Sequence, residues 1–230
     1  MKLQTLLSDL VALFYPKLCV VCGNPLVEGE EYLCLRCRLQ LPATRYPFAN
    51  NPAHERFKGK APCEKIMPCL FYNKGGIGQQ IVAEIKYKNN PAFGMWMGSY
   101  AANNLIDPDF FRDIHCLIPV PLHPKKMRKR RFNQSEMLAT GISKATGIPL
   151  IADCLYRRIA NPTQTKRGSY ERWLNTMDIF AVRNRETLAD KQTILIDDVL
   201  TTGSTLESCI NALLVCENIK ISILTLSVTL

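Results

Sequence analysis

The stretch Thr193-Ile-Leu-Ile-Asp197-Asp198-Val-Leu-Thr201-Thr202-Gly203-Ser204-Thr205 decides how we interpret the fold. Its apolar run at 194–196 is typical of a strand that is covered on both faces, as in parallel sheets. Two carboxylates, a turn of small hydroxyl residues and a helical pattern follow in that order. A strand, a polar turn and a helix predict an α/β domain, with the turn at the carboxyl end of a strand, where such domains bind ligands.

Similar strand-like runs and helical patterns alternate outward from this stretch. We expect strands at 68–72, 114–120, 150–155, 193–199 and 220–228, and helices at 77–87, 92–105, 133–146 and 204–217. This alternation predicts a mostly parallel central sheet with flanking helices. We expect a cysteine-rich module at 1–42, a connecting segment at 43–66 and the α/β domain at 67–230.

The residues of the polar turn suit a ribose phosphate. The turn at Thr201, Thr202, Gly203, Ser204 and Thr205 opens a helix, where free N–H groups and the helix dipole favour a phosphate. The side chains of Asp197 and Asp198 are suited to accept hydrogen bonds from a vicinal diol, and they could hold Mg²⁺. A phosphate site beside a diol site predicts a ribose 5-phosphate ligand.

A ligand-free interpretation explains part of the same pattern. Ser204 and Glu207 have the spacing of a capping box, which needs no ligand. An aspartate at the end of a strand can also simply begin a turn. Neither interpretation accounts for two carboxylates followed by a run of small and hydroxyl residues.

Four cysteines form two pairs, Cys19-x2-Cys22 and Cys34-x2-Cys37. Two such turns can complete a tetrahedron of sulfurs around Zn²⁺ and leave no open position, so the spacing predicts a structural zinc site. Disulfides, free thiols and an iron–sulfur cluster are the alternatives. The other six cysteines lack this spacing, and we expect them in or near the core: Cys63, Cys69, Cys116, Cys154, Cys209 and Cys216.

A basic segment precedes the expected helix at 133–146. Six of the seven residues from Lys125 to Arg131 are cationic, and the whole chain has a formal net charge of +9. This charge favours anionic partners such as phosphates or nucleic acid. A solvated basic loop is the alternative interpretation.

The N-terminal residues 1–15 carry apolar side chains at helical spacing. We expect an amphipathic helix that packs on the protein, with a membrane-surface or partner-binding helix as the alternative. No apolar run is long enough to span a membrane, and the pattern of a signal peptide is missing from 1–15. A cytoplasmic location is the expectation.

The stretch at 193–205 resembles the signature of type I phosphoribosyltransferases that binds phosphoribosyl pyrophosphate (PRPP). The chain as a whole resembles the competence-associated ComF family. The motifs that carry this resemblance are the paired cysteines, Ile85-Lys-Tyr-Lys88, Pro119-Val-Pro-Leu-His123, Arg131-Phe-Asn-Gln134, the segment from Gln164 to Asn175 and the PRPP signature. One departure is Arg131-Phe-Asn133, where relatives often have Arg-Gly-Phe-Asn.

The resemblance implies a role for each part of the site. Asp197 and Asp198 would contact the ribose hydroxyls, and Thr201 to Thr205 would hold the 5′-phosphate. The pyrophosphate loop would comprise Pro121, Leu122, His123 and Lys125, and a flap over the substrate would carry Gln164, Arg167 and Arg172. The implied fold is that of a type I phosphoribosyltransferase, with structural Zn²⁺ in the cysteine module and Mg²⁺ accompanying PRPP.

Two function classes follow from the resemblance, and a third from the zinc module. The first is a phosphoribosyltransferase that transfers phosphoribosyl to an unidentified nitrogen acceptor. The second is a factor in DNA uptake that binds single-stranded DNA or a helicase-like protein, with the PRPP site as a sensor or a relic. The third is a scaffold whose zinc module docks a protein partner.

Overall fold

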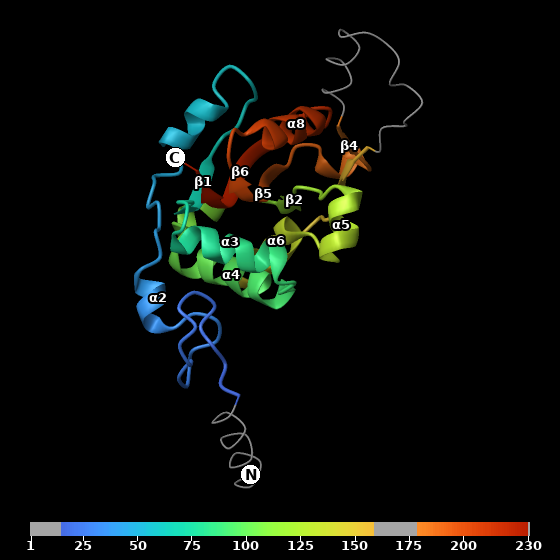
Figure 1. The fold of residues 1–230 in the computed structure, drawn as a ribbon. Coiled ribbons are helices and arrows are strands. Elements are labelled where there is room, and N and C mark those ends of the chain that lie inside the picture. The colour runs from blue at the N-terminus through green and yellow to red at the C-terminus, as the bar shows by residue number, and fades with distance from the viewer. Residues whose placement is uncertain (1–14, 159–178, 230) are drawn as a thin grey trace.

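A parallel four-stranded sheet forms the centre of the computed structural model, which describes residues 15–158 and 179–229 (Figure 1). Its strands lie in the order β1-β6-β5-β2, and all three neighbouring pairs are parallel. The strands are β1 (Ile66–Phe71), β2 (Cys116–Pro119), β5 (Gln192–Leu200) and β6 (Lys220–Val228). The predicted α/β class with a parallel sheet is therefore confirmed.

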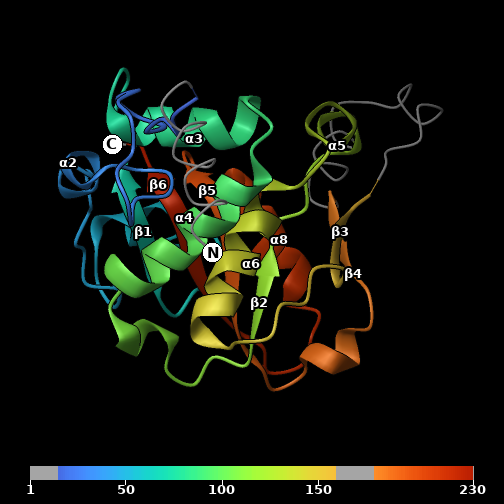
Figure 2. The ribbon, with the colours of Figure 1, turned by 90° about the horizontal axis from the view of Figure 1, so that it is seen from below.

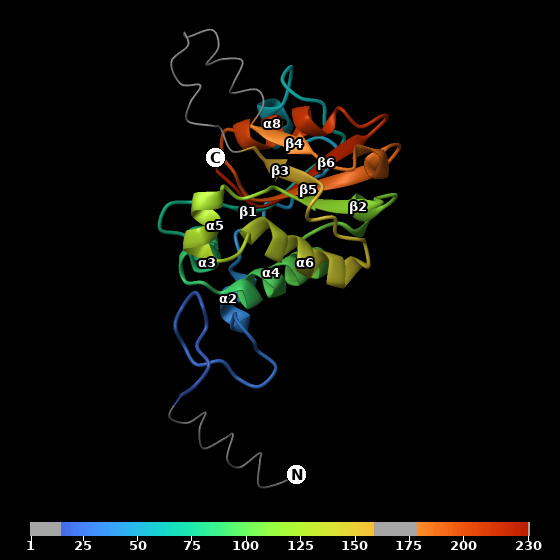
Figure 3. The ribbon, with the colours of Figure 1, turned by 90° about the vertical axis from the view of Figure 1, so that its right-hand side faces the viewer.

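Helices cover both faces of this sheet (Figures 2 and 3). One face carries α3 (Ile77–Tyr87), α4 (Pro91–Asn104) and α6 (Gln134–Thr146), and the opposite face carries α8 (Ser204–Leu213). The sheet separates two apolar clusters: Ile194 and Ile196 of β5 belong to one, and Leu195 to the other. The central strand is thus buried on both faces, as its apolar run predicted.

Helices α4 and α6 pack against each other through glycines. A Cβ atom on Gly141 would lie 1.9 Å from the carbonyl oxygen of Met95, and one on Gly98 would lie 2.2 Å from that of Leu138. Ser99 also donates a hydrogen bond to the Gly141 carbonyl oxygen, at 2.8 Å. This close backbone packing fixes α6, and therefore the residues at its N-terminus, against the rest of the domain.

The expected strand at 150–155 is wrong. Leu150 forms only an isolated bridge with Leu117. The strand β3 (Leu155–Arg157) starts where the expected one ends, and it pairs with β4 (Phe180–Val182) in a separate two-stranded antiparallel sheet. The chain bends at Asp153 and Cys154, so the apolar run cannot continue as an edge strand.

The cysteine module packs on the helical face of the domain. Cys19 and Cys37 are buried and belong to the same apolar cluster as α4, and Cys37 lies on the short helix α2 (Leu35–Leu39). The Tyr32 ring lies 5.4 Å from that of Phe93 on α4. The helix expected at 1–15 lies almost wholly outside the described residues.

None of the helices in the described parts of the chain is long and apolar enough to cross a membrane.

Candidate functional site

A cleft of about 660 Å³ lies at the carboxyl ends of β2 and β5. It is lined by residues from four regions that are far apart in the sequence: 72–87, 120–135, Arg157 and 197–205. Of the predicted site residues it brings together Pro121, Leu122, His123, Asp197, Asp198, Thr201 and Thr205.

One ion pair and two hydrogen bonds hold the acidic pair. Asp198 forms an ion pair with Lys86 of α3, with 2.8 Å between Nζ and Oδ1, and the two side chains are only 14% and 20% exposed. The Oδ1 atom of Asp197 accepts hydrogen bonds from the Ser135 hydroxyl and the Asp198 N–H, both at 2.9 Å. The two carboxylates are therefore oriented before any ligand arrives.

The electrostatics of the pair favour a proton on Asp197. Burial and the neighbouring charge of Asp198 raise the pKa of Asp197 from 3.8 to about 7. The Asp198 N–H, the Ser135 hydroxyl and the Lys86 ammonium oppose this rise in pKa. Near neutral pH Asp197 therefore gains and loses a proton readily, and a nearby cation would favour its charged form.

The turn after β5 leads directly into the N-terminus of α8. Gly203 is the N-cap of α8 and has φ +86°, a left-handed conformation that suits glycine, and as a glycine it offers the helix no side-chain cap. The capping box proposed for Ser204 and Glu207 is thus wrong, because Ser204 already lies inside the helix. Thr201 and Thr205 face the cleft, and the hydroxyl oxygens of Thr202 in the turn and Ser204 at the first position of α8 are 3.2 Å apart.

The segment after β2 folds into a helix, α5 (Pro124–Arg130), where the sequence suggested a loop. His123 is its N-cap: the Nδ1 atom accepts a hydrogen bond from the Lys125 N–H at 3.1 Å. Pro121, Leu122 and His123 line the cleft, whereas Lys125 is exposed outside its lining and Lys126 lies within it.

Asn133 connects this segment to the acidic pair. Its buried side chain donates to the Val120 carbonyl oxygen at 2.9 Å and accepts from the Ser135 N–H at 3.2 Å. It thereby caps α6 and places the Ser135 hydroxyl against Asp197. The predicted flap residues Gln164, Arg167 and Arg172 lie outside the described residues.

Several cleft residues besides Ser135 were not predicted as site residues from the sequence. Lys86 pairs with Asp198, and Arg157 of β3 also lines the cleft. Tyr87 is 72% exposed at its edge, and the Arg130 guanidinium lies 5.5 Å from its ring centre. The motif Ile85-Lys-Tyr-Lys88 contains Lys86 and Tyr87 and could have pointed to both. Its spacing alone does not reveal which of its side chains turn toward the acidic pair.

The four paired cysteines form one cluster. Their Sγ atoms all lie within 4.8 Å of one another, and those of Cys22 and Cys34 are 3.7 Å apart. A tetrahedral zinc site with bonds of about 2.3 Å needs about 3.8 Å between sulfurs. An iron–sulfur cluster spreads its four cysteines over several irons and would hold them farther apart. The cluster thus fits a single metal ion such as zinc.

The backbone of the module favours thiolate at one ligand. Burial alone would raise the pKa of Cys19, but backbone N–H groups of Cys22, Cys34 and Val21 lower it to about 6. Gly23, directly after the second cysteine, has φ +72°, and its N–H donates to the Cys19 carbonyl oxygen at 2.9 Å. This turn brings the Sγ atoms of Cys19 and Cys22 close together.

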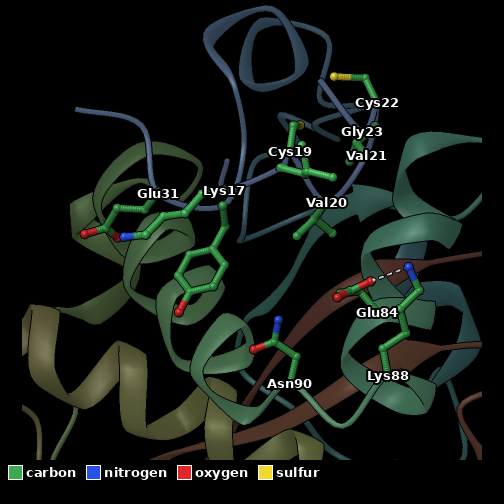
Figure 4. A pocket seen from close by; sticks show the side chains of 12 residues that line it. Lys17, Cys19, Val20, Val21, Cys22, Gly23, Glu31, Glu84, Lys88 and Asn90 are labelled. Atoms are coloured by element: carbon green, nitrogen blue, oxygen red, sulfur yellow. Dashed lines mark ion pairs between the residues drawn. The ribbon is translucent and has the colours of Figure 1, made fainter. Parts of the chain in front are cut away.

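A larger cavity of about 840 Å³ lies between this module and the helices α3 and α4 (Figure 4). Glu84 and Lys88 of α3 line it and form an ion pair at 3.1 Å. Its lining contains neither a pair of adjacent carboxylates nor a hydroxyl-rich turn. We therefore place the candidate ligand site in the smaller cleft.

Comparison with characterised proteins identifies two relatives. The chain is 36% identical over 98 residues to competence protein ComFC of Bacillus subtilis (strain 168), a match that covers 43% of this chain and 38% of that protein. It is 31% identical over 92 residues to competence protein F of Haemophilus influenzae, covering 40% of each. No family model matches the chain. The chain is thus similar to ComF-type competence proteins, as its motifs predicted, over about two fifths of their length.

Solved structures that resemble the chain include two PRPP-related enzymes. A glutamine PRPP amidotransferase from B. subtilis, complexed with ADP and GMP, aligns with a TM-score of 0.42 and 17% identity, over 62% of this chain and 30% of that one. A purine phosphoribosyltransferase from Pyrococcus horikoshii aligns with a TM-score of 0.36 and 19% identity, over 58% and 74%.

Proposed function

We propose that this ComF-like chain binds PRPP together with Mg²⁺ in the cleft at the carboxyl ends of β2 and β5. The observation that carries the proposal is the convergence there of the acidic pair, the hydroxyl-rich turn and the segment 121–123. Asp197 and Asp198 would accept hydrogen bonds from the ribose hydroxyls. The turn at Thr201–Thr205 would take the 5′-phosphate, and the cations Lys126 and Arg130 would face the pyrophosphate.

The same arrangement supports phosphoribosyl transfer to a nitrogen nucleophile. Breaking the bond to pyrophosphate leaves positive character on the ribose ring and negative charge on the leaving group. Carboxylates fixed near the ribose and cations fixed near the pyrophosphate stabilise both developing charges. Bound Mg²⁺ would add charge neutralisation on the pyrophosphate.

Calorimetric titration of the metal-loaded protein with PRPP and Mg²⁺ tests the binding. We expect saturable binding that Asp197→Asn abolishes and that a matched control, Asp190→Asn, retains, because Asp190 lies outside the cleft and contacts Asn218. A parent protein that does not bind PRPP would refute the proposal. If it binds, release of pyrophosphate on addition of a panel of nucleobases tests transfer.

We also propose that the four-cysteine cluster binds structural Zn²⁺. The sulfur distances fit a single tetrahedral ion, and metal binding would supply folding free energy to a module with little regular structure. Elemental analysis of purified protein should find one zinc per chain. Replacing Cys22 by Ser should remove it, whereas Cys63→Ser should not. Iron and acid-labile sulfide in the protein would refute this assignment.

A second candidate function is binding of single-stranded nucleic acid along α5. Four of its cations are exposed, and the exposed ring of Tyr87 lies beside Arg130, so a stacking surface adjoins a basic helix. The names of the two competence-protein relatives are consistent with a role near DNA. Fluorescence anisotropy with a labelled oligonucleotide should show affinity that falls steeply with salt. Equal binding after neutralisation of residues 125–131 would exclude this surface.

A further inference from the structure

The segment that leads into β1 contacts the hydroxyl-rich turn through Arg56 and Phe57. A short 3₁₀ helix, Pro52–Arg56, begins after the buried Asn51. The Asn51 side chain donates to the carbonyl oxygens of Ile66, at 2.7 Å, and Pro47, at 2.9 Å, and accepts from the Ala53 N–H at 2.9 Å. These bonds tie the helix to the first residue of β1, so Arg56 has a fixed position relative to the sheet.

Arg56 reaches the carboxyl ends of two central strands. Its guanidinium donates to the carbonyl oxygens of Leu200, at 3.1 Å, of Thr201 and of Thr229. Thr229 also donates its N–H to the Leu200 carbonyl oxygen at 3.0 Å. Arg56 therefore joins the end of β5, the start of the turn and the residue after β6.

This contact also sets the direction of backbone N–H groups in the turn. In a trans peptide the carbonyl and the following N–H point in opposite directions. Holding the carbonyl oxygens of Leu200 and Thr201 against Arg56 aims the N–H groups of Thr201 and Thr202 away from it. Among the described residues these two N–H groups have no acceptor, so they remain available to a ligand.

Phe57 closes the underside of the same turn. Its side chain is 2% exposed, and a Cβ atom on Gly203 would lie 3.3 Å from its Cζ atom. The charge of Arg56, in contrast, has no carboxylate partner within 15–158 and 179–229. A cation without a carboxylate partner among the described residues and an aromatic ring thus lie beneath the turn.

We propose that Arg56 is a positioning residue for a phosphate monoester: it holds the turn Thr201–Thr205 in a phosphate-binding shape and places a positive charge beneath it. The proposal rests on the proposed function of this cleft and extends the site to a segment outside the PRPP signature. The role is confined to the 5′-phosphate end. The pyrophosphate end is built from residues 121–130 and does not involve Arg56.

Two measurements on the metal-loaded full chain test this role, with Arg56→Met, Arg56→Lys and a control, Arg112→Met. Arg112 is an exposed arginine that pairs locally with Asp109. Hydrogen exchange of the ligand-free protein should be about tenfold faster in Arg56→Met at Glu207 and Thr229, whose N–H groups donate to the carbonyl oxygens of Gly203 and Leu200, because the charge-assisted hydrogen bonds that hold this backbone are lost. The control should match the parent, and Arg56→Lys should lie between.

Calorimetry then separates the two ends of the site. Ribose 5-phosphate should bind about tenfold more weakly to Arg56→Met, while Mg²⁺-pyrophosphate binds as it does to the parent. Unchanged exchange at Glu207 and Thr229, or equal weakening of both ligands, would overturn the positioning role. A parent that binds neither ligand would refute the proposed function, whereas faster exchange confined to Arg56→Met would still establish that Arg56 holds the turn.

Discussion

Replacing Lys86 by Met tests whether the acidic pair depends on a cation from α3. The substitution keeps most of the aliphatic stem and removes only the ammonium group that lies 2.8 Å from Asp198. Two adjacent carboxylates would then share a poorly hydrated site without their nearest positive charge. We expect the folded protein to lose stability and to become more sensitive to pH.

The size of the loss follows from the burial of the pair. Removing one partner of a buried ion pair costs about 3–5 kcal/mol, whereas an exposed pair contributes about 0.2–1 kcal/mol. The two side chains are 20% and 14% exposed, so the site lies between these limits. We expect the free energy of unfolding to fall by about 2 kcal/mol at pH 8, between the two limits.

The pH dependence of this loss has a definite sign. The pKa of Asp197 already lies above its unfolded value, and removing the Lys86 cation, which lowers it, raises this pKa further. The folded variant then binds more protons than the unfolded one, so its stability falls as the pH rises. The difference from the parent should therefore be smaller at pH 5 than at pH 8.

Urea unfolding at both pH values measures these differences, and Lys88→Met is the matched control. Lys88 lies on the same helix and pairs with Glu84 at 3.1 Å, but its side chain is 70% exposed. The control should lose no more than about 0.5 kcal/mol. Our reasoning fails if Lys86→Met loses as little as the control, or if its loss is the same at pH 5 and pH 8.

Two further predictions concern single atoms of the fold. Asp197→Asn should raise the free energy of unfolding by about 1–2 kcal/mol at pH 8 and leave it unchanged near pH 4. The reason is that a carboxyl group whose pKa rises from 3.8 to about 7 on folding destabilises the folded state only when it is charged. Urea unfolding between pH 4 and pH 8 measures the gain, and a gain that does not depend on pH would contradict this prediction. Gly141→Ala should lower the free energy of unfolding by about 3 kcal/mol, because its Cβ atom would overlap the Met95 carbonyl oxygen. The control is Gly76→Ala, whose Cβ atom has no neighbour closer than 3.2 Å. Thermal unfolding should show a much smaller loss of stability for Gly76→Ala than for Gly141→Ala, and equal losses would refute the packing argument.

The central strand and its turn were predictable from sequence because local patterns determine them. A continuous apolar run can be satisfied only by a strand covered on both faces, and small residues after it suit a tight turn into a helix. The strand expected at 193–199 is observed at Gln192–Leu200, and the helix that follows it begins at Ser204, as expected. The helix at Ile77–Tyr87 also has its expected bounds.

The parts of the site that were missed depend on contacts between distant segments. Lys86 precedes Asp198 by more than one hundred residues, and no periodicity reveals that they meet. Arg56 lies in the segment 43–66, which we expected to be a connecting segment because it is rich in polar residues. The sequence pattern does not reveal that the ring of Phe57 in this segment is buried. Helix α5 was missed for a different reason: it has almost no apolar residues, so it shows no helical periodicity, although Pro124 at its first position favours a helix start.

The position of β6 in the sheet has a consequence for the order in which the fold can form. β6 lies between β1 and β5, yet it begins at Lys220, long after β1 begins at Ile66. During synthesis, β1 and β5 therefore have no common partner until β6 has left the ribosome. Such long-range parallel pairing is slow, because a large loop must close before any contact forms. The nascent chain must therefore keep its apolar strands from aggregating through most of its synthesis.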